Sequence, residues 1–366
     1  MCNLNNKKNI MSGNKSIINL KDNIDFTKEP LFFGESLNLE RYDKFRYPSI
    51  FKMVNQQTES FWRPQEIDIT IDKADYNKLS ENEKFIFTSN LKYQILLDSV
   101  QSRGIPNLVE YLSNPEAEAF CSWWAAFETL HSQSYSHIIE NVYPSSGIVF
   151  DNILNNEHII KRTISVTKYY DNLINSIGDS EYELKKKLLL TLASVNILEG
   201  IRFYVSFACS WAFAENNMME GNAKIIKLIA RDENLHLGFT QFVLIKLKNE
   251  KKEGFLEVWE ECEPLIIKMF EDAAKEEMEW AKYLFKDGSM LGLNTEILTE
   301  FMKYLVNNRM TAIGLKRVFE KTKNPIPWIN NWLGAVQVAP QETEITSYNV
   351  GAIKSDLNDA EFDFDI

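Results

Sequence analysis

The chain has 366 residues, 45% of them hydrophobic, and a formal net charge of −12 at pH 7. This acidic balance argues against a nucleic-acid-binding surface, because binding to phosphates needs clustered Lys and Arg side chains. With only 14 Gly and 10 Pro, few turn signals interrupt the apolar stretches, and the composition predicts an all-α fold with a large core.

The N-terminus lacks the apolar core of a signal peptide, and we expect no membrane span because no apolar run is long enough. The four cysteines, Cys2, Cys121, Cys209 and Cys262, are far apart in the sequence and form no C-x-x-C motif. They fit reduced thiols in a cytoplasmic protein.

The first part of the chain is polar. Residues 1–28 are rich in Asn, Lys and Ser, and we expect them to be disordered. A loop-rich segment follows, with FWRP at 61–64 and EIDITID at 66–72. The alternation in the second motif predicts a short strand.

Long helices are expected from residue 80 onward. Ser80 and Glu83 form a capping box for the first, which ends near Gly104 and Pro106. Asn114 and Pro115 begin the second, which reaches about residue 142. The apolar pattern predicts further helices at about 151–176, 180–215, 224–248, 252–286 and 295–321. The globular part therefore spans 29–336, and residues 337–366 form a polar, flexible tail with spaced apolar residues that suit a partner.

Two of the four histidines follow a glutamate by three positions, in the pairs Glu128/His131 and Glu233/His236. Residues at i and i+3 share a helix face, so each pair can bind one metal ion from one side. The doubled motif is typical of helical bundles that hold two iron or manganese ions. The other two histidines, His137 and His158, lack such a glutamate and are interpreted as surface or structural residues.

Asp98 and Glu199 complete a plausible ligand set, since both lie within apolar helical stretches. A buried carboxylate needs a cation, and for Glu199 the neighbouring Arg202 is a rival to a metal. Four carboxylates balance two divalent ions, and this hard donor set suits Fe or Mn and not structural Zn. Asp232 is a candidate partner for a metal-bound histidine.

Tyr135 lies one helical turn beyond His131, roughly 6 Å along the axis. A phenol at that distance from a metal pair can be oxidised by it, although an ordinary core tyrosine fits the spacing equally well. On the helix that carries Glu233 and His236, Ile229 lies one turn before Glu233.

These residues belong to motifs that resemble the small, radical-generating subunit of class I ribonucleotide reductase, in its tyrosyl-radical form. The resemblance covers roughly residues 29–348 and includes EPLFFG, FWRP, NLKYQILLDS, ETLHSQSY, SVNILEGIRFYVSFACS, EGNAKIIKLIARDENLH, NPIPWI and VQVAPQE. It implies a ferritin-like di-metal carboxylate bundle with additional helices.

The resemblance also implies roles for individual residues. Asp98, Glu128 and His131 would bind one iron, and Glu199, Glu233 and His236 the other, in an oxo-bridged pair. Tyr135 would carry the radical, shielded by Phe203, Phe207 and Ile229. Trp62 and Asp232 would conduct electrons, and Glu342 and Tyr348 would relay the radical. The tail would dock on a large subunit that reduces ribonucleotides, and the small subunit would be a homodimer that uses O₂.

Three other functions remain open on the sequence. A di-metal oxidase with its own substrate would leave Tyr348 and the tail without a purpose. A ferritin-like iron store would assemble into a cage, and a purely structural bundle would hold no metal. Iron and manganese both accept this donor set, so manganese remains possible.

Overall fold

The computed structural model describes residues 19–334, and all regular structure in that range is helical. The long helices are α2 (Pro48–Glu59), α4 (Glu81–Gly104), α6 (Pro115–Val142), α8 (Glu157–Ile174), α9 (Glu181–Ile197), α10 (Tyr204–Glu215), α11 (Glu220–Asn249), α12 (Leu256–Leu284) and α13 (Thr295–Ala312). Shorter ones are α3 (Asp72–Lys78), α5 (Pro106–Val109), α7 (Gly147–Phe150) and α14 (Ile329–Leu333). The predicted all-α fold is confirmed.

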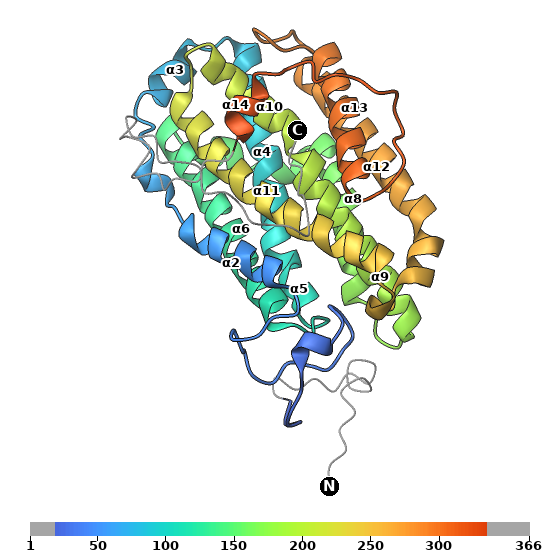
Figure 1. The fold of residues 1–366 in the computed structure, drawn as a ribbon. Coiled ribbons are helices and arrows are strands. Elements are labelled where there is room, and N and C mark those ends of the chain that lie inside the picture. Colours follow the sequence, from blue (N-terminus) through green and yellow to red (C-terminus); the bar gives the residue numbers. More distant parts are fainter. Residues whose placement is uncertain (1–18, 335–366) are drawn as a thin grey trace.

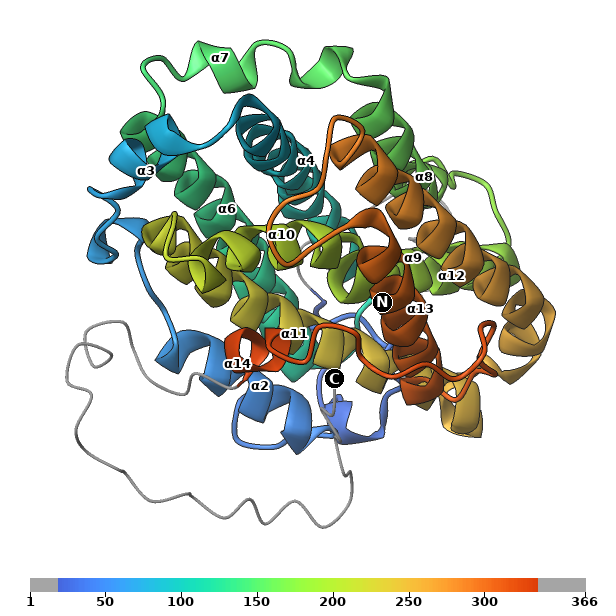
Figure 2. The same ribbon diagram turned by 90° about the horizontal axis from the view of Figure 1, so that it is seen from above.

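The helices form a bundle with outer additions (Figure 1). α4 packs against α6 and α8, α9 packs against α8 and α11, and α10 packs against α11. α2 packs against α6, and α12 packs against α9 and carries α13 beside it. Seen from above, α4, α6, α10 and α11 surround the middle of the molecule, with α2 and α3 on the side opposite α12 and α13 (Figure 2). The middle of the bundle is therefore shielded by helices on several sides.

Local sequence signals explain several helix ends. The predicted capping box of α4 is confirmed, because Ser80 accepts from the backbone N–H of Glu83 while the Glu83 carboxylate accepts from that of Ser80. α6 begins at Pro115 and ends at Val142, as predicted. α13 ends earlier than the expected residue 321, because Gly314 adopts φ +70° and the Leu315 N–H bonds back to the Met310 carbonyl.

The segment before α4 differs from its prediction. The strand expected at 66–72 is wrong: Pro64–Glu66 forms a 3₁₀ turn, and Asp68 accepts from the Thr70 N–H at 2.9 Å. That side-chain bond turns the backbone before it can extend. Helix α2 was missed, although its buried residues Ile50, Met53, Val54 and Gln57 follow a helical period.

Two of the other predicted helices are interrupted. The helix expected at 151–176 begins only at Glu157, where Asn156 caps it, and the short helices α7 and Ile153–Asn155 precede it. The helix expected at 180–215 is split into α9, a π-helical segment at Leu198–Arg202 and α10. Such one-turn π segments frequently occur at functional sites.

The stretch Glu181–Glu215 also corrects the expectation that no apolar run has the length of a membrane span. It is long and apolar enough by length and composition, but 94% of its most apolar window is buried inside the protein. That burial is the pattern of a core helix.

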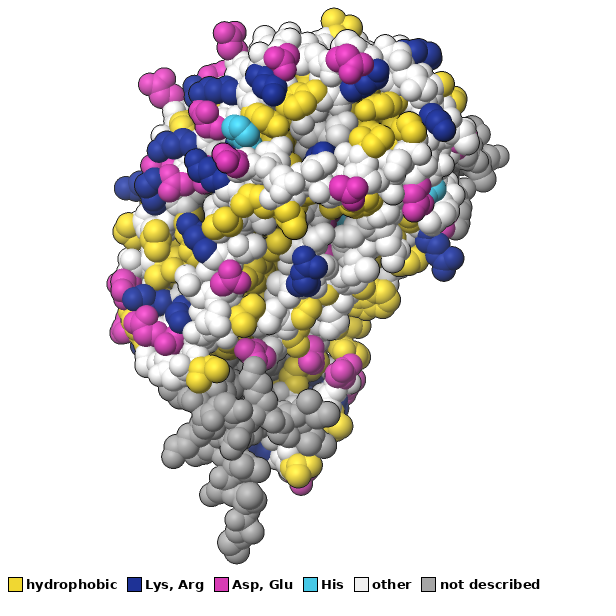
Figure 3. Space-filling view, turned by 180° about the vertical axis from the view of Figure 1, so that it is seen from behind, with side chains coloured by type: hydrophobic (Ala, Val, Ile, Leu, Met, Phe, Trp, Pro, Cys, Tyr) yellow, Lys and Arg dark blue, Asp and Glu magenta, His cyan; other side chains and the backbone are white. Residues whose placement is uncertain are grey.

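Figure 3 shows one face of the molecule, where acidic and basic side chains are interspersed, so positive charge is not concentrated there.

The described part of the chain begins ahead of the expected boundary at residue 29. Residues 19–28 include the 3₁₀ helix Phe26–Lys28, whose Phe26 carbonyl accepts from Asn114 Nδ2 at 3.0 Å. The disorder predicted for residues 1–18 and the predicted tail at 337–366 lie outside the described residues. Cys121, Cys209 and Cys262 are free and buried.

Candidate metal centre

Four segments bring six potential ligands together in the middle of the bundle. All six side chains have no solvent exposure: Asp98 from α4, Glu128 and His131 from α6, Glu199 from the π-helical segment, and Glu233 and His236 from α11. They form two groups, and within each group one ligand atom per residue lies within 4.8 Å of the others. Glu128 and Glu233 belong to both groups, so the two groups lie next to each other and share these two carboxylates.

Unpaired atoms indicate that the groups face a cation. The buried atoms Asp98 Oδ1 and Oδ2, Glu128 Oε2, His131 Nδ1, Glu199 Oε2 and Glu233 Oε1 have no hydrogen-bond partner within the described structure. Leaving so many acceptors unsatisfied in one place is very costly in a folded protein. Carboxylate oxygens with one imidazole per group match the preferences of iron and manganese. The residues present therefore fit a pair of metal ions.

The pKa values of the carboxylates also indicate that the two groups require positive charge. Burial, followed by the charges of Glu128 and Glu233, raises the pKa of Asp98 well above its ordinary value. Burial and the neighbouring carboxylates likewise raise the pKa values of Glu128 and Glu199. Without a metal, the site therefore reduces its negative charge by holding protons.

The pKa values of the His131 imidazole and the Glu233 carboxylate shift in opposite directions. Burial alone would lower the pKa of His131, but Glu233, Asp232 and Glu128 outweigh it and raise that pKa well above its ordinary value. Burial would raise the pKa of Glu233, but His131 and His236 outweigh that effect and lower it. Both shifts favour an ion pair, with the proton on His131 and the negative charge on Glu233, whose atoms His131 Nδ1 and Glu233 Oε1 lie 3.1 Å apart.

A hydrogen-bonded chain leads from His131 toward the outside of the bundle. His131 Nε2 lies 3.2 Å from Asp232 Oδ2, and the indole N–H of Trp62 donates to the same oxygen at 2.8 Å. Trp62 is fully buried, whereas the adjacent Phe61 is 48% exposed. Arg231 holds the other oxygen of Asp232 at 2.9 Å. The structure therefore connects Trp62 through Asp232 to His131 by hydrogen bonds, and the electron-transfer role of the two residues stays a prediction.

Trp124 and Gln101, to which the sequence analysis gave no role, hold two of the carboxylates in place. The Trp124 indole N–H donates to Glu128 Oε1 at 2.8 Å, and its ring stacks on His236 with centroids 4.8 Å apart. Gln101 Nε2 donates to Glu199 Oε1, and the Gln101 carbonyl accepts from the Tyr170 hydroxyl at 2.8 Å. Gln101 lies three positions after Asp98, on the same apolar helix, and that spacing was the signal for it.

Arg202 does not pair with Glu199. Its guanidinium points to α12, where it lies 2.8 Å from Glu276 Oε2 and 3.4 Å from Glu277 Oε1. The π-helical segment places Arg202 and Glu199 on different sides, so the rival explanation for Glu199 is wrong. Among residues 19–334, Glu199 therefore has no Lys or Arg partner to offset its burial, and its nearest basic group is His236, whose Nδ1 lies 4.0 Å from Glu199 Oε2.

Tyr135 is fully buried, and its hydroxyl has no hydrogen-bond partner among the described residues. Burial, followed by the charge of Asp98, raises the pKa of Tyr135 well above its ordinary value. The three residues expected to shield it, Phe203, Phe207 and Ile229, also have no exposure, and the two phenyl rings stack with centroids 5.6 Å apart. Tyr135 is thus buried within reach of the Asp98 charge, and the shielding role of the three apolar residues stays a prediction. Glu342 and Tyr348 lie outside the described residues.

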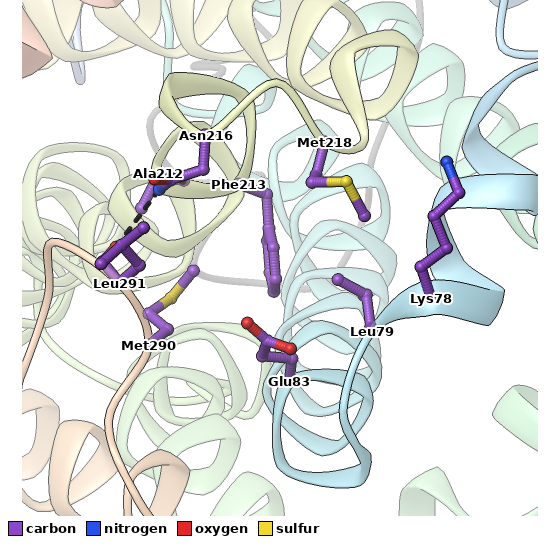
Figure 4. A pocket seen from close by; sticks show the side chains of 9 residues that line it. All are labelled: Lys78, Leu79, Glu83, Ala212, Phe213, Asn216, Met218, Met290 and Leu291. Carbon is purple, nitrogen blue, oxygen red and sulfur yellow. Dashed lines mark hydrogen bonds between the residues drawn. The ribbon is translucent and has the colours of Figure 1, made fainter.

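A cavity of about 220 Å³ lies elsewhere in the molecule. It sits where the start of α4 meets the end of α10, and Phe213, Met218 and Met290 converge there (Figure 4). None of the six candidate ligands lines it. This cavity therefore does not open into the metal centre.

Comparisons with known proteins agree with this geometry. The family described as "Ribonucleotide reductase, small chain" matches residues 40–325. The ribonucleoside-diphosphate reductase subunit beta of Buchnera aphidicola is 51% identical over 358 residues, covering 92% of this chain and 95% of that protein.

Solved structures show the same fold. The ribonucleotide reductase R2 subunit from Clostridium botulinum aligns with a TM-score of 0.78 and 30% identity, over 87% of this chain and 98% of that one. A dimanganese(II) protein of Streptococcus sanguinis aligns with a TM-score of 0.66 and 23% identity, over 82% of this chain and 100% of that one. At that identity the second comparison concerns the fold alone.

Proposed function

The chain belongs to the family of ribonucleotide reductase small chains, and on this premise we propose how its buried centre serves that activity. It is the small subunit of ribonucleoside-diphosphate reductase, which acts together with a large subunit to make deoxyribonucleotides. The reading as a di-metal oxidase with its own substrate is not favoured. The observation that carries the proposal is the pair of ligand groups sharing Glu128 and Glu233.

Asp98, Glu128 and His131 would hold one metal and Glu199, Glu233 and His236 the other, with Glu128 and Glu233 between them. We propose iron as the metal, although the donor set also accepts manganese. When bound, the pair supplies oxidising power by reducing O₂. The hydrogen bonds from Trp124 and Gln101 orient Glu128 and Glu199, and Asp232 orients His131.

Tyr135 is the residue that would be oxidised. It would lose one electron and its hydroxyl proton, leaving a neutral tyrosyl radical. After burial, the charge of Asp98 contributes most to raising the pKa of Tyr135, so we propose that the hydroxyl proton leaves toward Asp98. The buried rings of Phe203 and Phe207 and the side chain of Ile229 would exclude water and reductants.

Trp62 would provide the path for electrons. Its indole reaches His131 through Asp232 by contacts of 2.8 and 3.2 Å. The same path would later carry the oxidising equivalent outward to Tyr348, with Glu342 nearby, and the tail at 337–366 would dock on the large subunit. We further propose that the protein is a cytoplasmic homodimer.

The proposal is tested by EPR spectroscopy on protein reconstituted with Fe(II) and O₂. A tyrosyl signal is expected in the wild type and in a Tyr143→Phe control, because Tyr143 is buried but is hydrogen-bonded to Thr88. The signal should be absent in Tyr135→Phe. A signal that persists in Tyr135→Phe would contradict the assignment, and its absence from the wild type would contradict the iron-radical mechanism.

Deleting residues 337–366 distinguishes formation of the radical from its use by the large subunit. Reductase activity measured with the large subunit should be lost, while the tyrosyl EPR signal remains. Full reductase activity in the truncated protein would contradict the docking role of the tail.

A further inference from the structure

Arg309 lies on α13, a helix that supplies none of the six candidate ligands, yet its side chain reaches the metal centre's supporting backbone. The residue is only 7% exposed. Its Nε donates to the Gly200 carbonyl at 3.2 Å, and its Nη2 donates to the Tyr204 hydroxyl at 2.8 Å. One guanidinium therefore holds two points on the segment that runs from the π helix into α10.

The first contact is made at the residue next to Glu199. A π-helical turn replaces the regular i to i−4 hydrogen bonds with i to i−5 ones and is rare outside functional sites. The Gly200 carbonyl in this turn accepts a hydrogen bond from Arg309. Arg309 thus stabilises the unusual turn that directs Glu199 into the site.

The π-helical segment is also pressed closely against α11. A Cβ atom at Gly200 would meet Leu237 Cδ1 at 2.9 Å and Arg309 Cδ at 3.3 Å. Leu237 directly follows the candidate ligand His236. Glycine at this position therefore allows the π-helical segment to lie close to both Leu237 of α11 and Arg309 of α13, because a larger residue would force these side chains to shift.

The second contact, from Arg309 to the Tyr204 hydroxyl, connects Arg309 to α11. The Tyr204 hydroxyl accepts from Arg309 and donates to Asn234 Oδ1 at 3.0 Å. Asn234 directly follows the candidate ligand Glu233. The Arg309 Cζ also lies 5.2 Å from the centre of the Tyr204 ring, which adds a cation–π contact.

We propose that Arg309 is a positioning residue for the metal that Glu199, Glu233 and His236 would hold. It fixes the segments that carry Glu199 and Glu233 relative to each other. The proposal rests on the proposed function only in requiring that the six residues hold two metals. A guanidinium suits this role since its planar fork can donate to two acceptors at once, whereas a lysine ammonium cannot reproduce the fork. Residues that orient metal ligands typically change metal affinity by about 10- to 100-fold when they are replaced.

The test measures Mn(II) binding to metal-free protein without O₂, so that no radical is involved. Free Mn(II) is followed by its EPR signal, and the exchange-coupled signal of a Mn(II) pair reports that both ions are bound. In Arg309→Lys, one of the two sites should weaken by about 10- to 100-fold, and the coupled signal should appear only at correspondingly higher Mn(II).

Asn307→Ala is the matched control on the same helix. Asn307 hydrogen-bonds to the backbone of Phe319 and Glu320, and none of these bonds reaches the π-helical segment. Both Mn(II) sites should keep wild-type affinity in this variant. Equal weakening in Arg309→Lys and Asn307→Ala would mean general destabilisation and would overturn the proposal, as would wild-type binding in a folded Arg309→Lys protein.

Tyr204→Phe keeps the test decisive if Arg309→Lys does not fold. It removes only the hydroxyl that joins Arg309 to Asn234, and it should weaken the same single site while circular dichroism stays unchanged. Two wild-type sites in Tyr204→Phe would refute the link to α11. These outcomes are independent of the tyrosyl signal, so a failure of the radical assignment would be recognised separately.

Discussion

Loading the centre with metal should release protons. In the metal-free protein, burial and mutual repulsion raise the pKa values of Asp98 and Glu199 well above normal, and the surrounding carboxylates do the same for His131. Each of these groups can therefore hold a proton near neutral pH. A metal ligand must be deprotonated, so binding has to displace those protons.

The size of the effect follows from counting these groups. Three groups with strongly raised pKa values give an upper limit of about three protons released per chain, and metal affinity should rise by up to about three powers of ten per pH unit where all three are displaced. The sign is fixed by the direction of the shifts. As the pH falls, the metal-free state gains protons and metal affinity falls.

Calorimetry measures the release directly. Mn(II) is titrated into metal-free protein in two buffers of different ionisation enthalpy, and the difference in heat gives the number of protons. Asp72→Asn is a suitable control, because burial raises the pKa of Asp72 to about 6 but this residue caps α11 away from the ligands. Release of less than about one proton between pH 6.5 and 8 would refute this account of the site. A change in proton release in Asp72→Asn would show that the protons come from elsewhere.

Three further variants test single contacts. Gln101→Leu leaves two buried oxygens unpaired and should lower the free energy of unfolding by about 1–3 kcal/mol in urea. Gln94→Leu should be nearly neutral, because the buried amide of Gln94 has no hydrogen-bond partner among residues 19–334; equal effects would contradict this reasoning. Ser80→Ala removes the capping box and should cost about 1 kcal/mol without changing the tyrosyl EPR signal, and a lost signal would show that the cap affects the site. Trp62→Phe deletes a hydrogen bond to the Asp232 carboxylate, which should cost about 1.5–3 kcal/mol in urea and abolish reductase activity; retained activity would exclude Trp62 from the electron path.

Local patterns in the sequence determined much of the fold and most of the candidate ligands. The capping box at Ser80 and the Asn114–Pro115 start are confirmed because caps depend on residues within one helical turn. Glu128 and His131 share a face for the same reason, since the i to i+3 spacing is a property of the helix itself. The family resemblance added roles for Tyr135 and Trp62 that no periodicity provides.

The tertiary structure decided what depends on distant partners. The apolar run at 180–215 looked like one helix, because the hydrophobic pattern does not change where the π-helical segment inserts its extra residue. Arg202 could be assigned to Glu199 from sequence distance, but its partners Glu276 and Glu277 belong to α12. Arg309 approaches Gly200 from more than a hundred positions away, and a local period carries no information about such a contact.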